Sequence, residues 1–149
     1  MGDFIPLNQA VRDWRGIAVT PSNNIYACVQ NGNIYKQTAG AGGFISLAQV
    51  VRPWLGMTAG PNGDVFACEY GGDIYRQVGG VGNFVALGES LPRNWNCMAA
   101  APNGDIYAGV DAGDIYIAAG LAPPPPLPNP IYGGSGGKDE ESYIMSILR

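Results

Sequence analysis

The sequence predicts an all-β protein made of repeated units, and three observations support this fold class. Sliding the 149-residue sequence by forty residues superposes two copies, in which 17 of 40 positions are identical. A third copy follows from Phe84, with one extra residue before Trp95. Within each copy, runs of five to seven residues rich in Ile, Val, Tyr and Phe alternate with turn residues, which is typical of β-strands. A period of this length indicates an array of supersecondary units.

Each copy contains four short strands in a fixed order. A segment such as Phe44-Ile-Ser-Leu-Ala alternates apolar and polar residues, and the segment after each Trp is small and apolar. Two aromatic strands follow, of the NIYACV and NIYKQT type. Turns such as Pro61-Asn62-Gly63-Asp64 place Pro where φ is fixed and Asn or Gly where φ is positive. No segment predicts a helix of useful length.

Four antiparallel strands in forty residues are typical of the blade of a β-propeller. The segments GIAVTPSNNIYA and GMTAGPNGDVFA resemble the blade opening of NHL-type propellers. The whole unit, with its Trp and its DIY-type strand, looks like the repeats of tachylectin-type and tectonin propellers over residues 4–120. This resemblance implies a β-propeller built of three four-stranded blades. A β-trefoil, which closes as a monomer, is the alternative.

The order of strands predicts an incomplete ring. The chain opens with a fourth strand, in which we expect Phe4, Ile5 and Leu7 to take part, and its third blade stops after the DIYIAA strand. Four blades are about the smallest ring of this architecture. We therefore expect two chains to pair head to tail into a six-bladed ring, with residues 4–7 of each completing the other's last blade. The predicted partner is the protein itself, with a dimer favoured.

The composition changes after residue 120 and divides the chain into three segments. Residues 1–120 form the propeller repeat domain, and residues 121–137 form a linker arm that is first Pro-rich and then Gly-rich. Residues 138–149 are expected to be a docking peptide that binds a larger assembly through an apolar set of side chains. That set is Tyr143, Ile144, Met145, Ile147 and Leu148. The Gly-Ser joint also resembles an engineered linker, so a grafted peptide is an open alternative.

Composition excludes several classes of function. The net charge of −4 leaves no basic surface for nucleic acid. No apolar run approaches the roughly twenty residues that cross a bilayer, and the N-terminus lacks a signal-like segment. We expect synthesis in a cytoplasm and a place in a virion or other particle.

The residue types argue against an enzyme. The sequence has no His, so the usual general base near neutral pH and the commonest transition-metal ligand are missing. The carboxylates of Asp64, Asp73, Asp105 and Asp114 each precede a strand, where turn formation explains them better than calcium does. We expect no cofactor and no metal. The three cysteines, Cys28, Cys68 and Cys97, are expected to be buried reduced thiols, with interchain disulfides as the alternative.

An Arg-x-Trp pattern recurs once in each copy. It consists of Arg12 and Trp14, Arg52 and Trp54, and Arg93 and Trp95. The favoured interpretation is structural, with the guanidinium lying over the indole or capping loop carbonyls and the Trp packed between blades. The functional interpretation is three equivalent sugar sites, with Trp stacked on a sugar ring.

Two functions from different classes remain. The first is a non-enzymatic structural or adhesion module of a larger assembly, anchored by its C-terminal arm. A phage virion or tail appendage is the preferred instance, because small repeat propellers of this type look similar to domains of phage structural proteins. The second, which the tachylectin-type resemblance implies, is a carbohydrate-binding lectin with repeated inter-blade sites that bind glycans.

Overall fold

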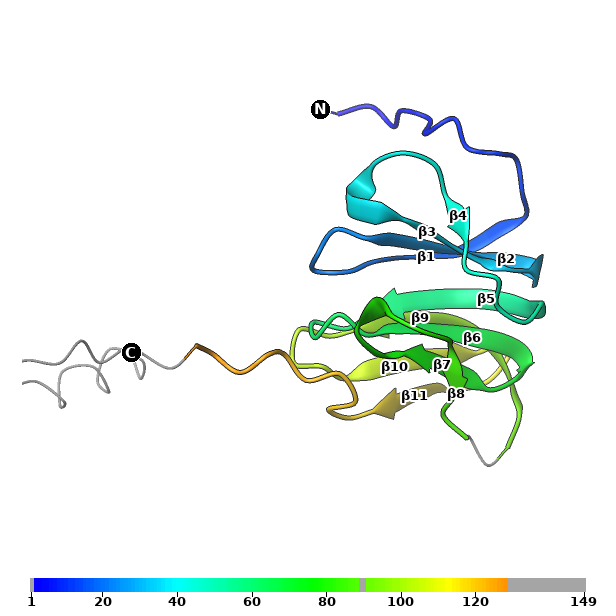
Figure 1. Cartoon of the computed structure of the whole chain (residues 1–149). Coiled ribbons are helices and arrows are strands. Elements are labelled where there is room, and N and C mark those ends of the chain that lie inside the picture. The colour runs from blue at the N-terminus through cyan, green and yellow to red at the C-terminus, as the bar shows by residue number, and fades with distance from the viewer. Residues whose placement is uncertain (1, 89–90, 129–149) are drawn as a thin grey trace, which may run out of the picture.

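The structure is a computed structural model that describes residues 2–88 and 91–128 of the chain. It contains eleven strands in three successive units, shown in Figure 1. The first unit consists of β1 (Trp14–Val19), β2 (Ile25–Gly32), β3 (Ile34–Gln37) and β4 (Ile45–Ser46). The second consists of β5 (Arg52–Ala59), β6 (Val65–Gly72), β7 (Ile74–Gln77) and β8 (Val85–Ala86). The third consists of β9 (Arg93–Ala100), β10 (Ile106–Val110) and β11 (Ile115–Ala118).

Every strand pair is antiparallel, and each unit is a meander in which sequential strands are neighbours. Short ladders join the units, where β2 pairs with β5 and β6 pairs with β9. The first strands of the three units also lie next to one another, β1 beside β5 and β5 beside β9. The expected all-β fold is confirmed. The described helical content is two 3₁₀ turns, η1 (Thr38–Gly40) and η2 (Val78–Gly80), and no described helix is long and apolar enough to span a membrane.

The turn between the first two strands of each unit forms as its sequence predicts. Gly63 has a φ of +88° and Asn23, at the equivalent position, has a φ of +60°. Both residue types tolerate this left-handed conformation better than other side chains do. The turn therefore reverses the chain within four residues and sets β6 directly against β5.

The core lies between units rather than inside one sheet. Tyr26, Cys28 and Ile34 of the first unit pack against Trp54 and Met57 of the second. The same layer recurs one unit later, where Cys68 and Ile74 pack against Trp95 and Ala108. Because each unit buries its apolar face on the next, removing a unit would expose its neighbour to water.

The two ends of this array are unfinished. β11 has no fourth strand beside it in the described part of the chain, and residues 2–13 form no strand. Phe4 is fully exposed, and the exposed fractions of Ile5 and Leu7 are 81% and 59%. The predicted strand exchange by these residues stays a prediction at this point. Cys97 is exposed, contrary to the expectation of a buried thiol, because no unit among the described residues covers β9.

The packed body extends slightly beyond the expected boundary at residue 120. Ala122 is completely buried and belongs to a cluster with Phe66 and Ile106. The described part of the arm then leaves on the side of the molecule that carries the β1–β2 turn (Figure 1). The start of the arm is thus part of the fold.

The substitution Gly56→Ala tests whether β5 and β9 lie as close together as the structure shows. A Cβ atom at Gly56 would lie 2.9 Å from the Cα atom of Cys97, so Gly56→Ala forces two strands apart. We expect it to lower the free energy of unfolding by about 1–3 kcal/mol in urea denaturation. Gly43→Ala is the matched control, because its Cβ would meet nothing closer than 3.8 Å. Equal stability of the two variants would contradict the packing described.

Candidate functional site

The Arg-x-Trp residues form one aromatic cluster in each unit. The rings of Trp14 and Tyr35 meet edge to face with centroids 5.3 Å apart, and Arg12 lies 4.6 Å from the centroid of Tyr35. The second unit repeats this geometry with Trp54 and Tyr75 at 5.0 Å. In the third unit, Trp95 and Tyr116 lie 5.3 Å apart with Arg93 at 4.5 Å from Tyr116. The pattern is therefore a packing motif of arginine on tyrosine beside tryptophan. The indole, on which the guanidinium was expected to lie, is farther away, at 6.0 Å from both Arg52 and Arg93.

The burial of these tryptophans leaves little room for a sugar. Trp54 and Trp95 each expose 1% of their surface, so neither ring has a free face on which a sugar could stack. Trp14 is half-buried, since no described unit packs against it as the first unit packs against Trp54. The arrangement favours the structural interpretation, and three equivalent sugar sites stay a prediction.

Arg52 is held on both sides. Its guanidinium lies 4.6 Å from the centroid of Tyr75, and its Nη1 is 3.2 Å from Oε2 of Glu69. The Tyr75 hydroxyl donates to the same Glu69 oxygen at 3.0 Å. This cation has its charge satisfied within the fold, which leaves it poorly placed to bind an anionic ligand.

Asp64 is a structural carboxylate in the β5–β6 turn. It is 2% exposed, and its Oδ1 accepts a hydrogen bond from the Gly79 N–H at 2.7 Å. Its Oδ2 accepts from Arg76 Nε at 2.8 Å and from Asn62 at 2.9 Å. Burial by itself raises the pKa of this carboxyl, but the Gly79 N–H and the Arg76 guanidinium outweigh burial, so the pKa lies below its ordinary value. Asp64 ties the turn to the loop after β7.

Asn24 and Asp105 occupy the equivalent position in the other units. The side chain of Asn24 accepts from Ala39 N–H at 3.0 Å, and Asp105 accepts from Gly120 N–H at 2.7 Å. Asp73 and Asp114 instead accept from the amide of the next residue, as expected for turn residues. No group of carboxylates, cysteines or histidines that could hold a metal ion occurs among residues 2–88 and 91–128.

The buried cysteines lack nucleophilic character. The Gly16 N–H donates to Sγ of Cys28 at 3.2 Å, and the Gly56 N–H does the same to Cys68. Burial raises the pKa of the Cys28 thiol to about 11 and that of Cys68 to about 12. Both thiols are therefore protonated at neutral pH, and a protonated thiol is a poor nucleophile.

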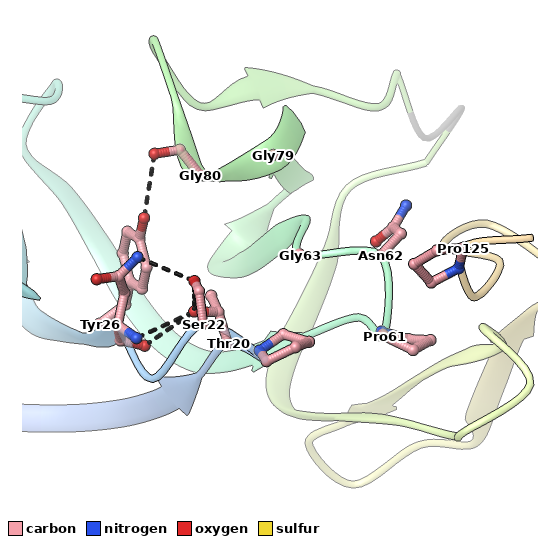
Figure 2. A pocket seen from close by; sticks show the side chains of 11 residues that line it. Thr20, Ser22, Tyr26, Pro61, Asn62, Gly63, Gly79, Gly80 and Pro125 are labelled. Atoms are coloured by element: carbon pink, nitrogen blue, oxygen red, sulfur yellow. Dashed lines mark hydrogen bonds between the residues drawn. The ribbon is translucent and has the colours of Figure 1, made fainter. Parts of the chain in front are cut away.

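A groove of about 270 Å³ lies between the first and second units, and Figure 2 shows it from close by. Polar side chains of Thr20 and Ser22 line one wall, and Asn62 lies on the opposite wall. Asn24 also lines the groove. The Tyr26 hydroxyl reaches across the junction to the carbonyl of Gly80 at 3.2 Å. The inter-unit groove is thus an open site lined in part by polar side chains.

The equivalent space between the second and third units is filled by the chain itself. There Gly60 replaces Thr20 and Phe66 replaces Tyr26, which removes a side chain and a hydroxyl group. Ala122 occupies the vacated space, with its N–H donating to the Gly104 carbonyl at 2.9 Å. A Cβ atom at Gly60 would collide with the methyl of Ala122. The inter-unit groove is therefore not repeated at this junction.

Sequence reasoning missed the role of Ala122. The available signal was the difference between repeats at positions 60 and 66, where the second copy is smaller than the first. The predicted docking side chains lie outside the described residues, so their contacts remain a prediction. They are Tyr143, Ile144, Met145, Ile147 and Leu148.

No protein-family model and no curated protein matches the sequence. Among solved structures, the chain is similar to YCF48 bound to D1 peptide, at 16% identity and a TM-score of 0.58 over 76% of this chain and 39% of that one. It is similar to virginiamycin B lyase from Staphylococcus aureus, at 15% identity and a TM-score of 0.52 over 71% of this chain and 41% of that one. The fold is β-propeller-like.

A third similar structure comes from Thermus thermophilus and is described as a putative oxidoreductase (glucose dehydrogenase). It is 18% identical, with a TM-score of 0.56 over 87% of this chain and 51% of that one. The propeller-like chain thus spans about 40 to 50% of the length of these three proteins. Two of them are named as enzymes, but at such identities the likeness concerns the fold alone.

The Asp64 network predicts a pH-dependent stability. Because the folded pKa of Asp64 is lowered, its contribution is present above the unfolded value near 3.9 and is lost as the pH falls through the folded value. We expect Asp64→Asn to cost about 1–3 kcal/mol at pH 7, and the difference from the unsubstituted chain to shrink toward pH 2. Urea unfolding across this range measures it. Asp3→Asn, at an exposed position, serves as control, and a pH-independent cost would contradict this account.

Proposed function

We propose that this chain is a non-enzymatic structural or adhesion module of a larger assembly, anchored through its C-terminal arm. The observation that carries the proposal is the burial of Ala122 at the junction between the second and third units. An arm that starts from a buried residue leaves the body at a fixed place and in a fixed direction. Such a start suits a segment that joins the body to a partner.

The residue types that could have made a catalytic or sugar site are used in packing. The three arginines of the repeated pattern lie over tyrosine rings, and two of the three tryptophans are buried. The buried thiols are protonated. These contacts support a scaffold role.

The arm itself has the composition of a spacer. Pro123 to Pro126 favour an extended polyproline II conformation, and Pro125 lines the inter-unit groove beside Asn62 (Figure 2). A propeller-like relative of known structure was solved with a peptide bound, which is a precedent for a peptide partner of this fold. A phage virion or tail appendage is the assembly that we favour, on the loose likeness of the repeats to phage structural domains.

We also propose that copies of the chain associate, with a dimer favoured. The support is the pair of unfinished ends, at which Phe4 is fully exposed and Ile115 exposes 72% of its surface. This association is separate from the anchoring role, which a monomer could equally perform.

Deletion of residues 129–149 tests the anchoring role. The full chain should sediment with particles purified from its source, whereas the chain ending at residue 128 should stay in the supernatant. Ile144→Asp should mimic the deletion, because a charge in an apolar docking segment is costly to bury. Asp139→Asn, in the acidic part of the arm, is the matched control. Equal sedimentation of all four chains would overturn the proposal.

A lectin is the second candidate function, and the inter-unit groove favours it. Its lining carries the hydroxyl groups of Thr20 and Ser22 and the amides of Asn24 and Asn62, which are chemical groups that suit sugar hydroxyls. In the unbound chain these groups bond to one another and to the turn. If this function holds, a glycan array should show binding that Asn62→Ala weakens by about tenfold or more. Asn103→Ala, at the equivalent turn of the third unit, should leave binding unchanged. Absence of binding to any glycan would exclude the lectin.

A further inference from the structure

We propose that residues 4–7 of one copy form the missing fourth strand beside β11 of a second copy, and that the exchange is reciprocal. The occupant of the open edge is thus a second copy of this chain. The inference deepens the proposed self-association by naming its contacts, and it does not depend on the anchoring role.

The two completed units supply the template. β4 lies beside β3 with Tyr35 opposite Ser46, and β8 lies beside β7 with Tyr75 opposite Ala86. In both units the amide after this strand donates to the first residue of the third strand, from Leu47 to Ile34 and from Leu87 to Ile74. The repeat register therefore places Pro6 opposite Tyr116 and Ile5 opposite Ile117, with the Leu7 N–H donating to the Ile115 carbonyl.

Pro6 fits this register. The hydrogen-bonded pair of Leu47 and Ile34 makes the adjacent pair of Ser46 and Tyr35 a non-hydrogen-bonded one, so the Ser46 N–H points away from the ladder. Pro6 takes the equivalent position, where no N–H is required. Proline is tolerated on an edge strand under this condition.

An aromatic ring is missing from the third unit and surplus at the N-terminus. Phe44 lies 5.6 Å from Trp14, and Phe84 lies 6.4 Å from Trp54. In the part of the chain that the structure describes, Trp95 has Tyr116 but no phenylalanine beside it. Phe4, which aligns with Phe44 and Phe84, is fully exposed. Phe4 of the second copy would complete the cluster at Trp95.

The exposed faces at the two ends match the two sides of the buried junctions. Tyr26 and Ile34 are completely buried by the second unit, whereas the equivalent Tyr107 and Ile115 expose 38% and 72% of their surface. At the other end, Ile17 exposes 62%, although the equivalent Met57 exposes 4%. An apolar groove of about 690 Å³ lies here, between the N-terminal segment and the first unit. The exposed face at each end is therefore equivalent to one of the two faces that pack together at a buried junction.

One chain cannot join its own ends. The N-terminal segment and β1 lie at one end of the array and β11 lies at the other (Figure 1). Propeller rings contain at least about four blades, so three units leave a gap. Two copies related by a two-fold axis form two identical junctions and leave no unit without its fourth strand.

Cys97 takes the place of a glycine of the other two units, and this exchange fits the proposed junction between the third unit and the first unit of a second copy. Gly16 and Gly56 hold the same position in the first two units, and each packs against the first strand of the next unit. In the third unit the cysteine is on β9, and Gly109 replaces the cysteine of the second strand, where its missing side chain leaves room for the Cys97 sulfur. In the ring, Gly16 of the second copy would cover Cys97.

Cross-linking between two differently substituted chains tests the proposal. In a Cys97→Ser background, Ile5→Cys chains are mixed with Ile117→Cys chains, denatured, refolded together and oxidised. We expect a disulfide-linked dimer on a non-reducing gel, since opposite Cα atoms in a strand pair lie within disulfide range. Val85→Cys replaces Ile117→Cys as control, because β8 already lies at the outer edge of a completed unit. A link equally strong with Val85→Cys would overturn the proposed register.

Two further measurements test the proposal even if the geometry at the substituted positions prevents a disulfide from forming. Phe4→Ala should raise the dissociation constant, measured by sedimentation equilibrium, by more than about 100-fold, whereas Val85→Ala should leave it unchanged. Alkylation of Cys97 in the unsubstituted chain should slow as the chain associates on concentration. A chain that stays monomeric, or whose Cys97 reacts at one rate at all concentrations, overturns the ring. Neither result affects the sedimentation test of the arm, so the two proposals fail separately.

Discussion

The packing of one unit on the next is the interaction on which the structure depends. A three- or four-stranded unit buries little by itself, and the largest buried side chains, Trp54 and Trp95, become buried at junctions between units. Apolar burial is the dominant favourable term in folding, so stability accumulates with each junction. This arrangement explains why Ile17 of the first unit and Ile115 of the third are exposed. The equivalent Met57 and Ile74 of the second unit, which has a neighbour on both sides, are buried.

Small differences between the repeats carry the specific features of the molecule. The exchange of Thr20 and Tyr26 for Gly60 and Phe66 opens space that Ala122 fills. The exchange of Gly56 and Cys68 for Cys97 and Gly109 moves a sulfur from one strand to its neighbour. Identical repeats would form identical junctions. Because the repeats differ, the junction of the second and third units binds the start of the arm, and β9 exposes the Cys97 thiol.

The repeat period, the strand positions and the turns could be predicted from the sequence, because each follows from local chemistry. The Pro-Asn-Gly-Asp turns and the alternating aromatic strands are short-range signals, and the structure confirms them. The stacking of Arg52 on Tyr75 rather than on a ligand needed the three-dimensional pairing of β5 with β6 and β7. The burial of Ala122 and the exposure of Cys97 depend on which neighbouring unit is present. Patterns in a single sequence do not show which units come into contact, so neither feature could be predicted.

We propose that the chain encodes half of a closed ring and needs a second copy to cover the two ends of its array. The molar mass of the unsubstituted chain in solution, from light scattering coupled to size-exclusion chromatography, tests it most directly. A closed ring of two copies would be a compact particle of twice the chain mass of 15.6 kDa. A compact particle of 15.6 kDa at all concentrations would contradict it.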